Sequence, residues 1–337
     1  MERSVIAVQA VIQNYLHEAK IGRKQSHRNL AMYPLLSSYE VGLEYITLDE
    51  ALLEGLIEVV ERDEAGSVPE LKVINKSPCM ILILDGEELV GAKQNRIVNT
   101  TILLRGKSTI VIPVSCVEQG RWAYESRLFG SEERLMAAQL RAKKSEQVHR
   151  SIRRSEGFRS DQSAIWAEIS SKAARMEADS PTMAMAEIYK KKRSLLADYI
   201  EHFRLVEMQV GAVFMINGEV VGLDTFGSTE TFGKVFRKLI ESYALDSIDW
   251  SEQESSGQTL KSKVTKFLWA ANNATVECHR SVGLGTDIRL ESRTITGFAL
   301  AHEEKILHLS VFARSNESSE GRYIARMQRF SSRRRSR

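Results

Sequence analysis

The apolar positions near the start of the chain follow the spacing of a helix. Between Val5 and Leu16 they recur at nearly helical intervals, which predicts an amphipathic helix that Gly22 breaks. Residues 29–35 are mostly apolar and are predicted to form a strand that Pro34 stops.

A capping-box pattern marks the next helix. Thr47 stands three residues before Glu50, so the two side chains can each bind the other residue's backbone N–H. We expect a short helix that ends at Gly55, followed by a strand over residues 57–61.

Residues 71–117 have the pattern of a continuous β region. Asp85-Gly86 predicts a tight turn, because this pair tolerates positive φ angles, and a second turn is expected around Gly106-Lys107. The links are too short for helical crossovers, so an antiparallel sheet is predicted. Its strands are 71–74, 80–84, 97–104 and 109–117, with residues 87–91 leading away from the first turn.

Residues 131–207 are rich in alanine, leucine and long charged residues and are predicted to be helical, with a break near Gly157. Ser180 and Pro181 have the pattern of an N-cap followed by proline at the first helical position. A helix should therefore begin there and run to about Phe203.

The β pattern returns after residue 208, where apolar runs flank an Asn217-Gly218 turn. Segments 83–91 and 215–222 resemble each other, so a duplicated unit around a helical insert is an open alternative. The elements expected in this part are strands 213–216, 219–222, 275–280, 286–301 and 305–313 and helices 228–245 and 258–272.

These elements predict an α+β fold with an antiparallel β-sheet core, a helical insert and, in the duplicated alternative, two structurally related halves. The expected division is an N-terminal β-rich half (1–130), the helical insert (131–207), a C-terminal α+β half (208–314) and a flexible Arg/Ser-rich tail (315–337).

Composition narrows the class of protein without naming a function. The 337 residues are 43% hydrophobic and 27% charged, as in globular proteins, so global disorder is not expected. No apolar run approaches the ~18 residues of a membrane span, and no secretory cleavage site is recognised. Three cysteines make no disulfide framework, which favours a cytoplasmic location. A net charge of +3 does not by itself indicate nucleic-acid binding.

The most unusual polar segment lies between residues 85 and 101. Lys93 to Arg96 are four successive polar residues, which suit neither face of a half-buried strand; on a strand, Gln94 and Arg96 would share one face. Arg96 can bind a phosphate bidentately and Lys93 can add a point charge. Nearby amides and hydroxyls can hold a ribose or base, and carboxylates can serve as acid, base or cation ligand. These further candidates are Gln94, Asn95, Asn99, Thr100, Glu87 and Glu88. A polar hairpin at a sheet edge explains the same residues without a ligand.

A second polar group follows an apolar strand, at residues 113–122. Glu118 is a further acid/base candidate and Arg121 a further ligand-binding candidate; the alternative is a structural salt bridge beside a core Trp122. Catalysis by Cys116 would need a base and a lowered pKa. No histidine lies near it in sequence, so a structural cysteine is favoured.

Metal and dinucleotide motifs are weak. The seven histidines are scattered, and Cys278-His279 has no partner at zinc-finger spacing, so no metal site is predicted. Gly283 and Gly285 precede a strand instead of opening a helix, which does not fit a dinucleotide fingerprint. The cofactor stays undefined, with a divalent cation such as Mg²⁺ on the carboxylates as the open option.

The helical insert is locally basic between residues 134 and 159. One interpretation is a phosphate-backbone footprint that acts with the Arg-rich tail, and nucleic-acid binding would then depend strongly on salt. A solvated helix face is the commoner explanation. The basic residues are Arg134, Arg141, Lys143, Lys144, Arg150, Arg153, Arg154 and Arg159.

Five segments of this sequence also carry a family resemblance: 29–35, 45–52, 84–96, 99–101 and 112–122. They resemble the domain family named for its association with ADP-ribosylglycohydrolase and rhodanese-phosphatase proteins, over about residues 25–310. The resemblance implies work on ADP-ribose, NAD-derived metabolites or related nucleotides. It leaves open whether the chain is an enzyme; if it is, a hydrolase acting on a nucleotide or ADP-ribose derivative is implied. No catalytic residue of the family is carried over.

Three hypotheses follow. The first is binding or processing of a phosphorylated nucleoside, with Lys93 and Arg96 on the phosphate. The second is a nucleic-acid-binding or assembly module that acts through residues 134–159 and the tail. The third is a self-associating partner protein, in which a sheet edge makes a homo-oligomer.

Overall fold

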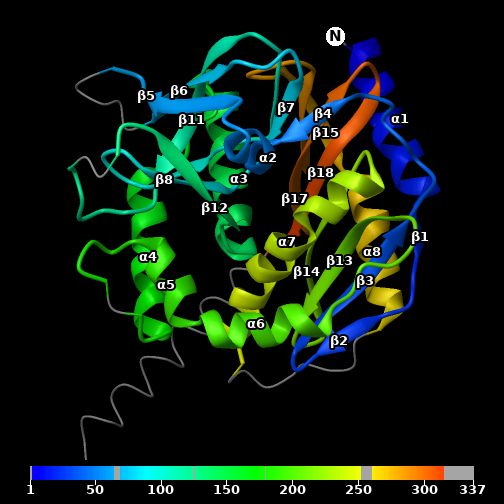
Figure 1. The fold of residues 1–337 in the computed structure, drawn as a ribbon. Coiled ribbons are helices and arrows are strands. Elements are labelled where there is room, and N and C mark those ends of the chain that lie inside the picture. Colours follow the sequence, from blue (N-terminus) through cyan, green and yellow to red (C-terminus); the bar gives the residue numbers. More distant parts are fainter. Residues whose placement is uncertain (1, 64–68, 124–125, 179, 252–259, 315–337) are drawn as a thin grey trace, which may run out of the picture.

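The computed structural model describes residues 2–63, 69–123, 126–178, 180–251 and 260–314, and for residues 2–7 the backbone alone. It has an α+β fold in which antiparallel sheets form the core, as the sequence predicts. In Figure 1 the smaller sheets lie at the upper left and the largest sheet at the right, with α7 (Thr229–Asp249) between them.

The largest sheet has nine strands in the order β1-β3-β13-β14-β18-β17-β16-β15, with β2 also paired to β3. Its first strands come from residues 20–36, and β3 of this group pairs with β13, so the sheet joins the beginning and the end of the described chain. The strands are β1 (Lys20–Ile21), β2 (Gln25–His27), β3 (Leu30–Leu36), β13 (Gln209–Ile216), β14 (Glu219–Phe226), β15 (Thr275–Arg280), β16 (Thr286–Glu291), β17 (Ile295–His302) and β18 (Lys305–Ala313).

Residues 45–135 form two smaller sheets. One has the order β12-β8-β9-β11-β6-β5, and the other has the order β10-β7-β4, in which β4 and β7 are parallel. The strands are β4 (Tyr45–Thr47), β5 (Ile57–Glu61), β6 (Glu70–Asn75), β7 (Met80–Ile83), β8 (Glu87–Gly91), β9 (Arg96–Val98), β10 (Ile102–Leu104), β11 (Thr109–Cys116) and β12 (Phe129–Leu135).

The two faces of the largest sheet are covered by different helices. Along β3, Leu30 and Met32 pack with the helical insert and α7, whereas Ala31 and Tyr33 pack with α1 and α8. This is the alternation that a strand with two buried faces requires. The remaining helices are α1 (Glu2–Glu18), α2 (Leu48–Leu53), α3 (Ala138–Arg153), α4 (Gln162–Arg175), α5 (Met185–Lys191), α6 (Arg193–His202) and α8 (Lys261–Asn272).

Several local predictions are confirmed. Thr47 caps α2 in a full capping box with Glu50, and a helical break falls at Gly157. The Asn217-Gly218 turn joins β13 to β14 as a hairpin. The tail from residue 315 lies outside the described residues.

Other local predictions are wrong. Strand β3 continues through Pro34 to Leu36, with the Pro34 carbonyl accepting from the Gly22 backbone N–H at 2.8 Å. Residues 97–104 and 286–301 each contain two strands instead of one, and residues 131–135 belong to β12.

The predicted helix start at Ser180-Pro181 is also wrong. Ser180 accepts a hydrogen bond from the Ala184 backbone N–H, but the helix begins only at Met185, because residues 182–185 bond to the backbone of residues 117–120, which follow β11. The helix is also interrupted at Lys192, between α5 and α6.

The Asp85-Gly86 turn forms with Gly86 at φ +83°, yet it joins strands of different sheets. Segment 83–91 therefore differs in pairing from the similar segment 215–222, which forms a hairpin.

Candidate functional site

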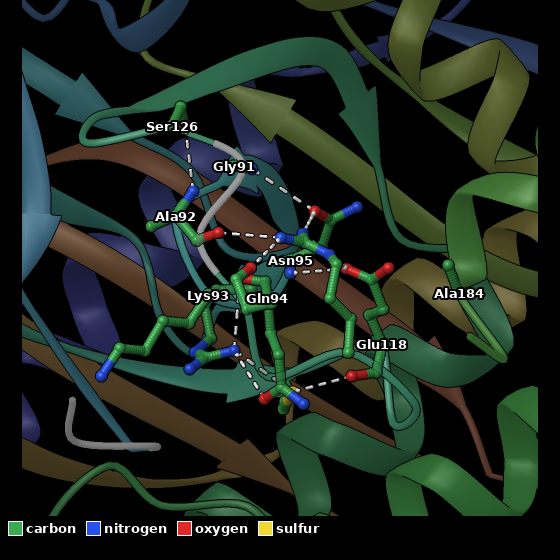
Figure 2. A network of polar contacts seen from close by, with 12 residues as sticks. Gly91, Ala92, Lys93, Gln94, Asn95, Glu118, Ser126 and Ala184 are labelled. Atoms are coloured by element: carbon green, nitrogen blue, oxygen red, sulfur yellow. Dashed lines mark hydrogen bonds and ion pairs between the residues drawn. The ribbon is translucent and has the colours of Figure 1, made fainter. Parts of the chain in front are cut away.

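The two polar groups of the sequence meet in space. Residues 91–96 lie against residues 116–122 (Figure 2). Together with Glu88, which binds Asn95, we call them the polar loop. Three of the candidate residues, Glu87, Asn99 and Thr100, bind instead to other buried groups, and Thr100 belongs to an interior charge network.

Glycine at position 91 allows the polar loop to form. Strand β8 ends at Gly91 with φ +123°, and a Cβ atom there would lie 2.5 Å from the Ser126 hydroxyl. That hydroxyl accepts from the Ala92 backbone N–H at 3.0 Å. The chain then turns through residues 92–95 into β9, so the alternating strand faces expected for Lys93 to Arg96 do not occur. All four residues are buried, the first three in the turn and Arg96 at the start of β9.

Arg96 is the most deeply buried cation of the polar loop. Its Nη1 donates to the Gln94 backbone carbonyl at 3.2 Å and side-chain oxygen at 3.1 Å, and to the Cys116 sulfur at 3.2 Å. Within the described part of the chain, its Nε and Nη2 atoms have no hydrogen-bond partner. The nearest ion pair is at the limit of contact, with Glu61 Oε1 4.0 Å from Nη2. Two buried nitrogen atoms of the guanidinium, with three N–H bonds between them, can therefore donate to an added acceptor.

Glu118 and Arg121 form an ion pair that fixes the loop. Arg121 Nη2 lies 2.7 Å from Glu118 Oε2, and this carboxylate also accepts from the Asn95 backbone N–H at 3.2 Å. Arg121 further donates to Asn95 Oδ1 and to the Ala92 carbonyl. Burial opposes the charge of Glu118, but the bonds from Arg121 hold its pKa below the ordinary value. Glu118 is thus an ionised structural partner, poorly suited to donate a proton.

Glu88 is the carboxyl group of the loop whose pKa lies near neutral pH. It is fully buried, and burial raises its pKa to about 7, although Arg134 lies 3.7 Å away. Its Oε1 accepts from Asn95 Nδ2 at 3.4 Å. A carboxyl group with this pKa can give or take a proton at neutral pH.

An aromatic ring lies next to the cations of the loop. The Lys93 ammonium is 5.3 Å from the ring centre of Trp122, and the Arg96 guanidinium carbon is 5.7 Å from it. Trp122 is 48% exposed, so part of its ring faces solvent. In Figure 2 the Lys93 side chain extends away from Glu118. The polar loop thus combines positive charge with an accessible aromatic surface.

Residues 182–185 cross one side of the loop. Gly120 donates its backbone N–H to Thr182 at 2.8 Å, and Met185 donates to Val117 at 2.9 Å. A Cβ atom at Gly120 would lie 2.8 Å from the Thr182 Cα. Figure 2 shows Ala184 on this crossing segment, beside Glu118.

Cys116 is not an activated nucleophile. It is buried, and burial raises the pKa of its thiol. It serves as a hydrogen-bond partner of Arg96 and Gln94.

The interior charge network joins residues from all parts of the fold. Lys144 binds Asp85, and Arg141 Nη2 lies 2.5 Å from Asp224 Oδ1. Asp224 also accepts from the Tyr243 hydroxyl at 2.8 Å and the Ser310 hydroxyl at 2.7 Å. The network is made of Asp85, Thr100, Thr101, Arg141, Lys144, Asp224, Tyr243, Asp287, Arg289, His308 and Ser310.

Glu87 is held by a cation from α7. Lys238 binds both Glu87 and Asp49, and although burial opposes its charge, the two carboxylates keep the pKa of Lys238 above the ordinary value. Glu87 therefore connects β8 to α7 and lies apart from the polar loop.

Asn99 and Thr100 also act as connections. Asn99 donates to the Phe158 carbonyl at 3.0 Å, and Thr100 donates to Asp287 Oδ2 at 2.9 Å while accepting from Arg289. Of the ten predicted site residues, the polar loop and its contacts bring together the remaining seven: Glu88, Lys93, Gln94, Asn95, Arg96, Glu118 and Arg121.

Sequence reasoning missed the importance of Asp224, Arg141 and Lys144. Arg141 and Lys144 had been placed in a basic surface, although their spacing puts them on one helix face with the apolar residues Leu140 and Val148. That spacing is the signal that marks them as buried. Asp224 carries no comparable local signal, because its partners come from distant parts of the chain.

The family comparison agrees with this picture of one connected fold. The model of ARPP-1, the ARG and Rhodanese-Phosphatase-superfamily-associated Protein domain, matches residues 18–312. The chain belongs to the ARPP-1 family. No curated protein and no solved structure matches the chain significantly.

The ARPP-1 match contains both the polar loop and the interior charge network. It also contains the basic residues of the insert, several of which are buried or paired with carboxylates. Arg141 and Lys144 are buried, Lys143 pairs with Glu168, and Arg153 pairs with Glu277 and Glu291. Arg150, Arg154 and Arg159 are the exposed basic residues that are left in this stretch of the ARPP-1 chain.

Two cavities of this ARPP-1 chain lie away from the polar loop, with volumes of about 110 Å³ and 250 Å³. The first lies between α1 and the β15–β18 strands, and the second beside α6. Among the described residues, every helix falls short of the length or the hydropathy that crossing a bilayer requires.

Proposed function

We propose that the chain binds or processes a phosphorylated nucleoside at the polar loop, with ADP-ribose or another NAD-derived metabolite as the leading candidate. The observation that carries the proposal is Arg96, whose Nε and Nη2 atoms are buried without a hydrogen-bond partner among the described residues. Leaving buried donors unpaired costs ~1–3 kcal/mol each, so an incoming acceptor would recover this energy.

The charges near Arg96 favour an anion. The polar loop and its contacts hold three cations, Lys93, Arg96 and Arg121, and two carboxylates, Glu61 and Glu118. Glu88 adds less than a full negative charge at neutral pH, because its pKa is about 7. A phosphate oxygen can bind the fork of Arg96 with two parallel bonds and Lys93 as a point charge.

The partly exposed ring of Trp122 favours a nucleoside over a simple phosphate. Base–aromatic stacking contributes ~1–3 kcal/mol and tolerates any base. The Gln94 and Asn95 amides are the groups assigned to ribose hydroxyls or a base edge. Asn99 and Thr100 remain structural connections, to Phe158 and to Asp287, in this proposal.

Hydrolysis is the reaction class to test first. Glu88 is the proposed acid or base, because its pKa of about 7 suits proton transfer at neutral pH. The family name points to association with ADP-ribosylglycohydrolase proteins, which makes a nucleotide or ADP-ribose derivative the substrate class to offer. The three free cysteines fit a reducing compartment, and we propose the cytoplasm.

A thermal-shift screen tests the proposal, with NAD, ADP-ribose, AMP, ribose 5-phosphate and short oligonucleotides, each with and without Mg²⁺. A ligand at 100 times its Kd should stabilise the chain by ~2.7 kcal/mol. The matched variants are Trp122→Leu and Trp269→Leu, because Trp269 is exposed on α8, far from the loop in sequence and contacts.

We expect ADP-ribose or NAD to shift the melting temperature of the wild type and of Trp269→Leu, and to shift Trp122→Leu much less. A shift of the melting temperature by oligonucleotides alone would instead favour nucleic-acid binding through the exposed arginines of the insert. Equal shifts of both tryptophan variants would contradict binding at the polar loop.

A further inference from the structure

Three potential metal ligands meet between β2 and α6. His27 lies on β2, while Asp198 and His202 lie one helical turn apart on α6. The His27 Nε2 is 2.9 Å from Asp198 Oδ2, and the His202 Nδ1 is 3.6 Å from Asp198 Oδ1. One ligand atom from each of the three residues lies within 4.8 Å of the others.

The scaffold holds these residues in place. Gln25 and Arg204 exchange two hydrogen bonds of 2.8 Å, which tie β2 to the end of α6. The Tyr199 ring packs edge-on against His27 at 5.1 Å, and its hydroxyl donates to Asn29 at 2.9 Å. The site is therefore built on two regular elements that are fixed relative to each other, as a preorganised metal site requires.

The two imidazoles lie beside the carboxylate, but one ring must turn before both can bind one ion. The His27 and His202 rings stack with centres 3.7 Å apart and planes 16° apart, and the His202 Nδ1 also hydrogen-bonds to the Asp198 backbone carbonyl at 2.7 Å. Because an imidazole binds a metal in its ring plane, the exposed His202 ring has to rotate about its side-chain bonds to share an ion with His27. The two side chains are 17% and 49% exposed, so solvent reaches the site. Imidazole nitrogen and carboxylate oxygen are the ligands that Zn²⁺ takes in sites with three protein ligands and one open position.

The second cavity shares residues with this cluster. Its volume is about 250 Å³, and its lining includes Arg28 and Tyr199. Arg28 Nη2 also lies 2.8 Å from Asp198 Oδ2, and the Arg28 side chain is 51% exposed. Arg28 thus stands between the cluster and solvent, as an exposed cation that can leave the carboxylate.

We propose that His27, Asp198 and His202 bind a divalent transition-metal ion of the zinc class, which takes the place of the Arg28 guanidinium on Asp198. The fourth metal position faces the side of the cavity that Arg28 and Tyr199 line, and holds water or an anionic group of a small ligand. This site is separate from the polar loop and does not depend on the function proposed for that loop.

Calorimetric titration with Zn²⁺, and with Co²⁺ as a spectroscopic probe, tests the proposal on the full chain. A Cys79→Ser background removes an exposed thiol that would compete for the metal. His202→Ala and Asp198→Asn each remove one ligand, and we expect at least about a tenfold loss of affinity, since even residues that only support metal ligands cost 10–100-fold.

Two further variants serve as a control and as a test for a gain of affinity. His17→Ala is the matched control, because His17 is exposed on α1 and outside the cluster; its affinity should equal that of the parent. Arg28→Gln removes the competing cation, so its affinity should rise several-fold. Circular dichroism of each variant checks that the fold is kept.

The result that would overturn the proposal is also defined. Equal affinities of His202→Ala and His17→Ala, or a weaker affinity in Arg28→Gln, would show that the metal binds elsewhere or not at all. Visible Co²⁺ absorption that persists in a folded Asp198→Asn variant at the parent's affinity would do the same.

Discussion

The polar loop and the interior charge network are both buried and highly charged, but they differ in how the charges are paired. In the network each cation touches a carboxylate: Arg289 lies 2.7 Å from Asp287, and Arg141 lies 2.5 Å from Asp224. In the loop the carboxylate nearest to the Arg96 guanidinium lies 4.0 Å away. A tryptophan that is half exposed lies over the loop, whereas the network is enclosed.

This difference assigns the two regions different tasks. A buried cation with a close carboxylate gains little from a ligand, and breaking such a pair is costly. Among the described residues, Arg141 and Arg289 also have one unpaired nitrogen each, but each of them contacts a carboxylate and Arg96 does not. A buried guanidinium without such a partner gains most from an acceptor that reaches it. We therefore expect substitutions in the network to change stability and substitutions in the loop to change binding.

The largest effect is expected for Asp224→Asn. The amide cannot balance the Arg141 charge, so the variant should lose ~3–5 kcal/mol of unfolding free energy. Urea denaturation measures it, with Glu304→Gln as the control, because Glu304 is exposed. Unchanged stability of Asp224→Asn would contradict the structural task of the network.

The contribution of Asp224 to the free energy of unfolding depends on pH in a defined direction. Burial opposes its charge, but Arg141 holds its pKa well below the ordinary value. Its contribution is therefore complete above the unfolded-state pKa of ~4 and is lost as the pH falls through the folded-state pKa. Wild-type stability should fall more steeply than that of Asp224→Asn in acid below pH ~4.

A second prediction concerns Glu88→Gln in the loop. The pKa of Glu88 is raised by burial to about 7, so the folded state binds a proton that the unfolded state releases above pH ~4.5. The wild type should lose up to about 3 kcal/mol of stability from this group between pH ~4.5 and pH ~7. In Glu88→Gln the free energy of unfolding should fall less with rising pH over this range. Urea denaturation at a series of pH values measures it. An unchanged slope would show that Glu88 is ionised throughout.

The third prediction is Lys93→Gln, which should weaken ADP-ribose binding by ~1.5–3 kcal/mol, because a charged hydrogen bond to phosphate is lost. Isothermal titration calorimetry measures the affinity. Lys76→Gln is the matched control, since Lys76 is exposed and pairs with Glu58 in the same β-rich part. Equal ADP-ribose affinities of the two variants would show that Lys93 does not contact the ligand.

The smallest effect is expected when Arg150 and Arg154 are both changed to glutamine. Both residues are exposed, so unfolding free energy and ADP-ribose affinity should change by less than ~0.5 kcal/mol. Electrophoretic mobility shift with an oligonucleotide at low and moderate salt tests the alternative. Salt-sensitive binding that the double variant loses would favour the nucleic-acid hypothesis.

Local signals predicted much of the fold, and long-range pairing explains what they missed. Thr47 and Glu50 form their capping box because all its atoms lie within one turn. Residues 131–135 form β12 in spite of their helical composition, because β8 offers an open edge to pair with. The start of α5 is displaced for the same reason, since residues 182–185 bond to residues 117–120.

The candidate site was predicted in part. The four successive polar residues from Lys93 to Arg96 identified the polar loop, because such a run does not fit a strand. Glu87, Asn99 and Thr100 belong to the same run of polar residues but bind Lys238, Phe158 and Asp287, which come from distant segments. Their partners cannot be read from one sequence. The meeting of His27 with α6 was missed for the same reason.

Hydrogen–deuterium exchange in the presence and absence of ADP-ribose tests the central claim most directly, because it reads the loop and the network in one experiment. We predict slower exchange in peptides that cover residues 91–96 and 117–122, and unchanged exchange in peptides that cover residues 141–150 and 222–226. Binding that leaves residues 91–96 unchanged, or no binding of ADP-ribose at all, would contradict the account.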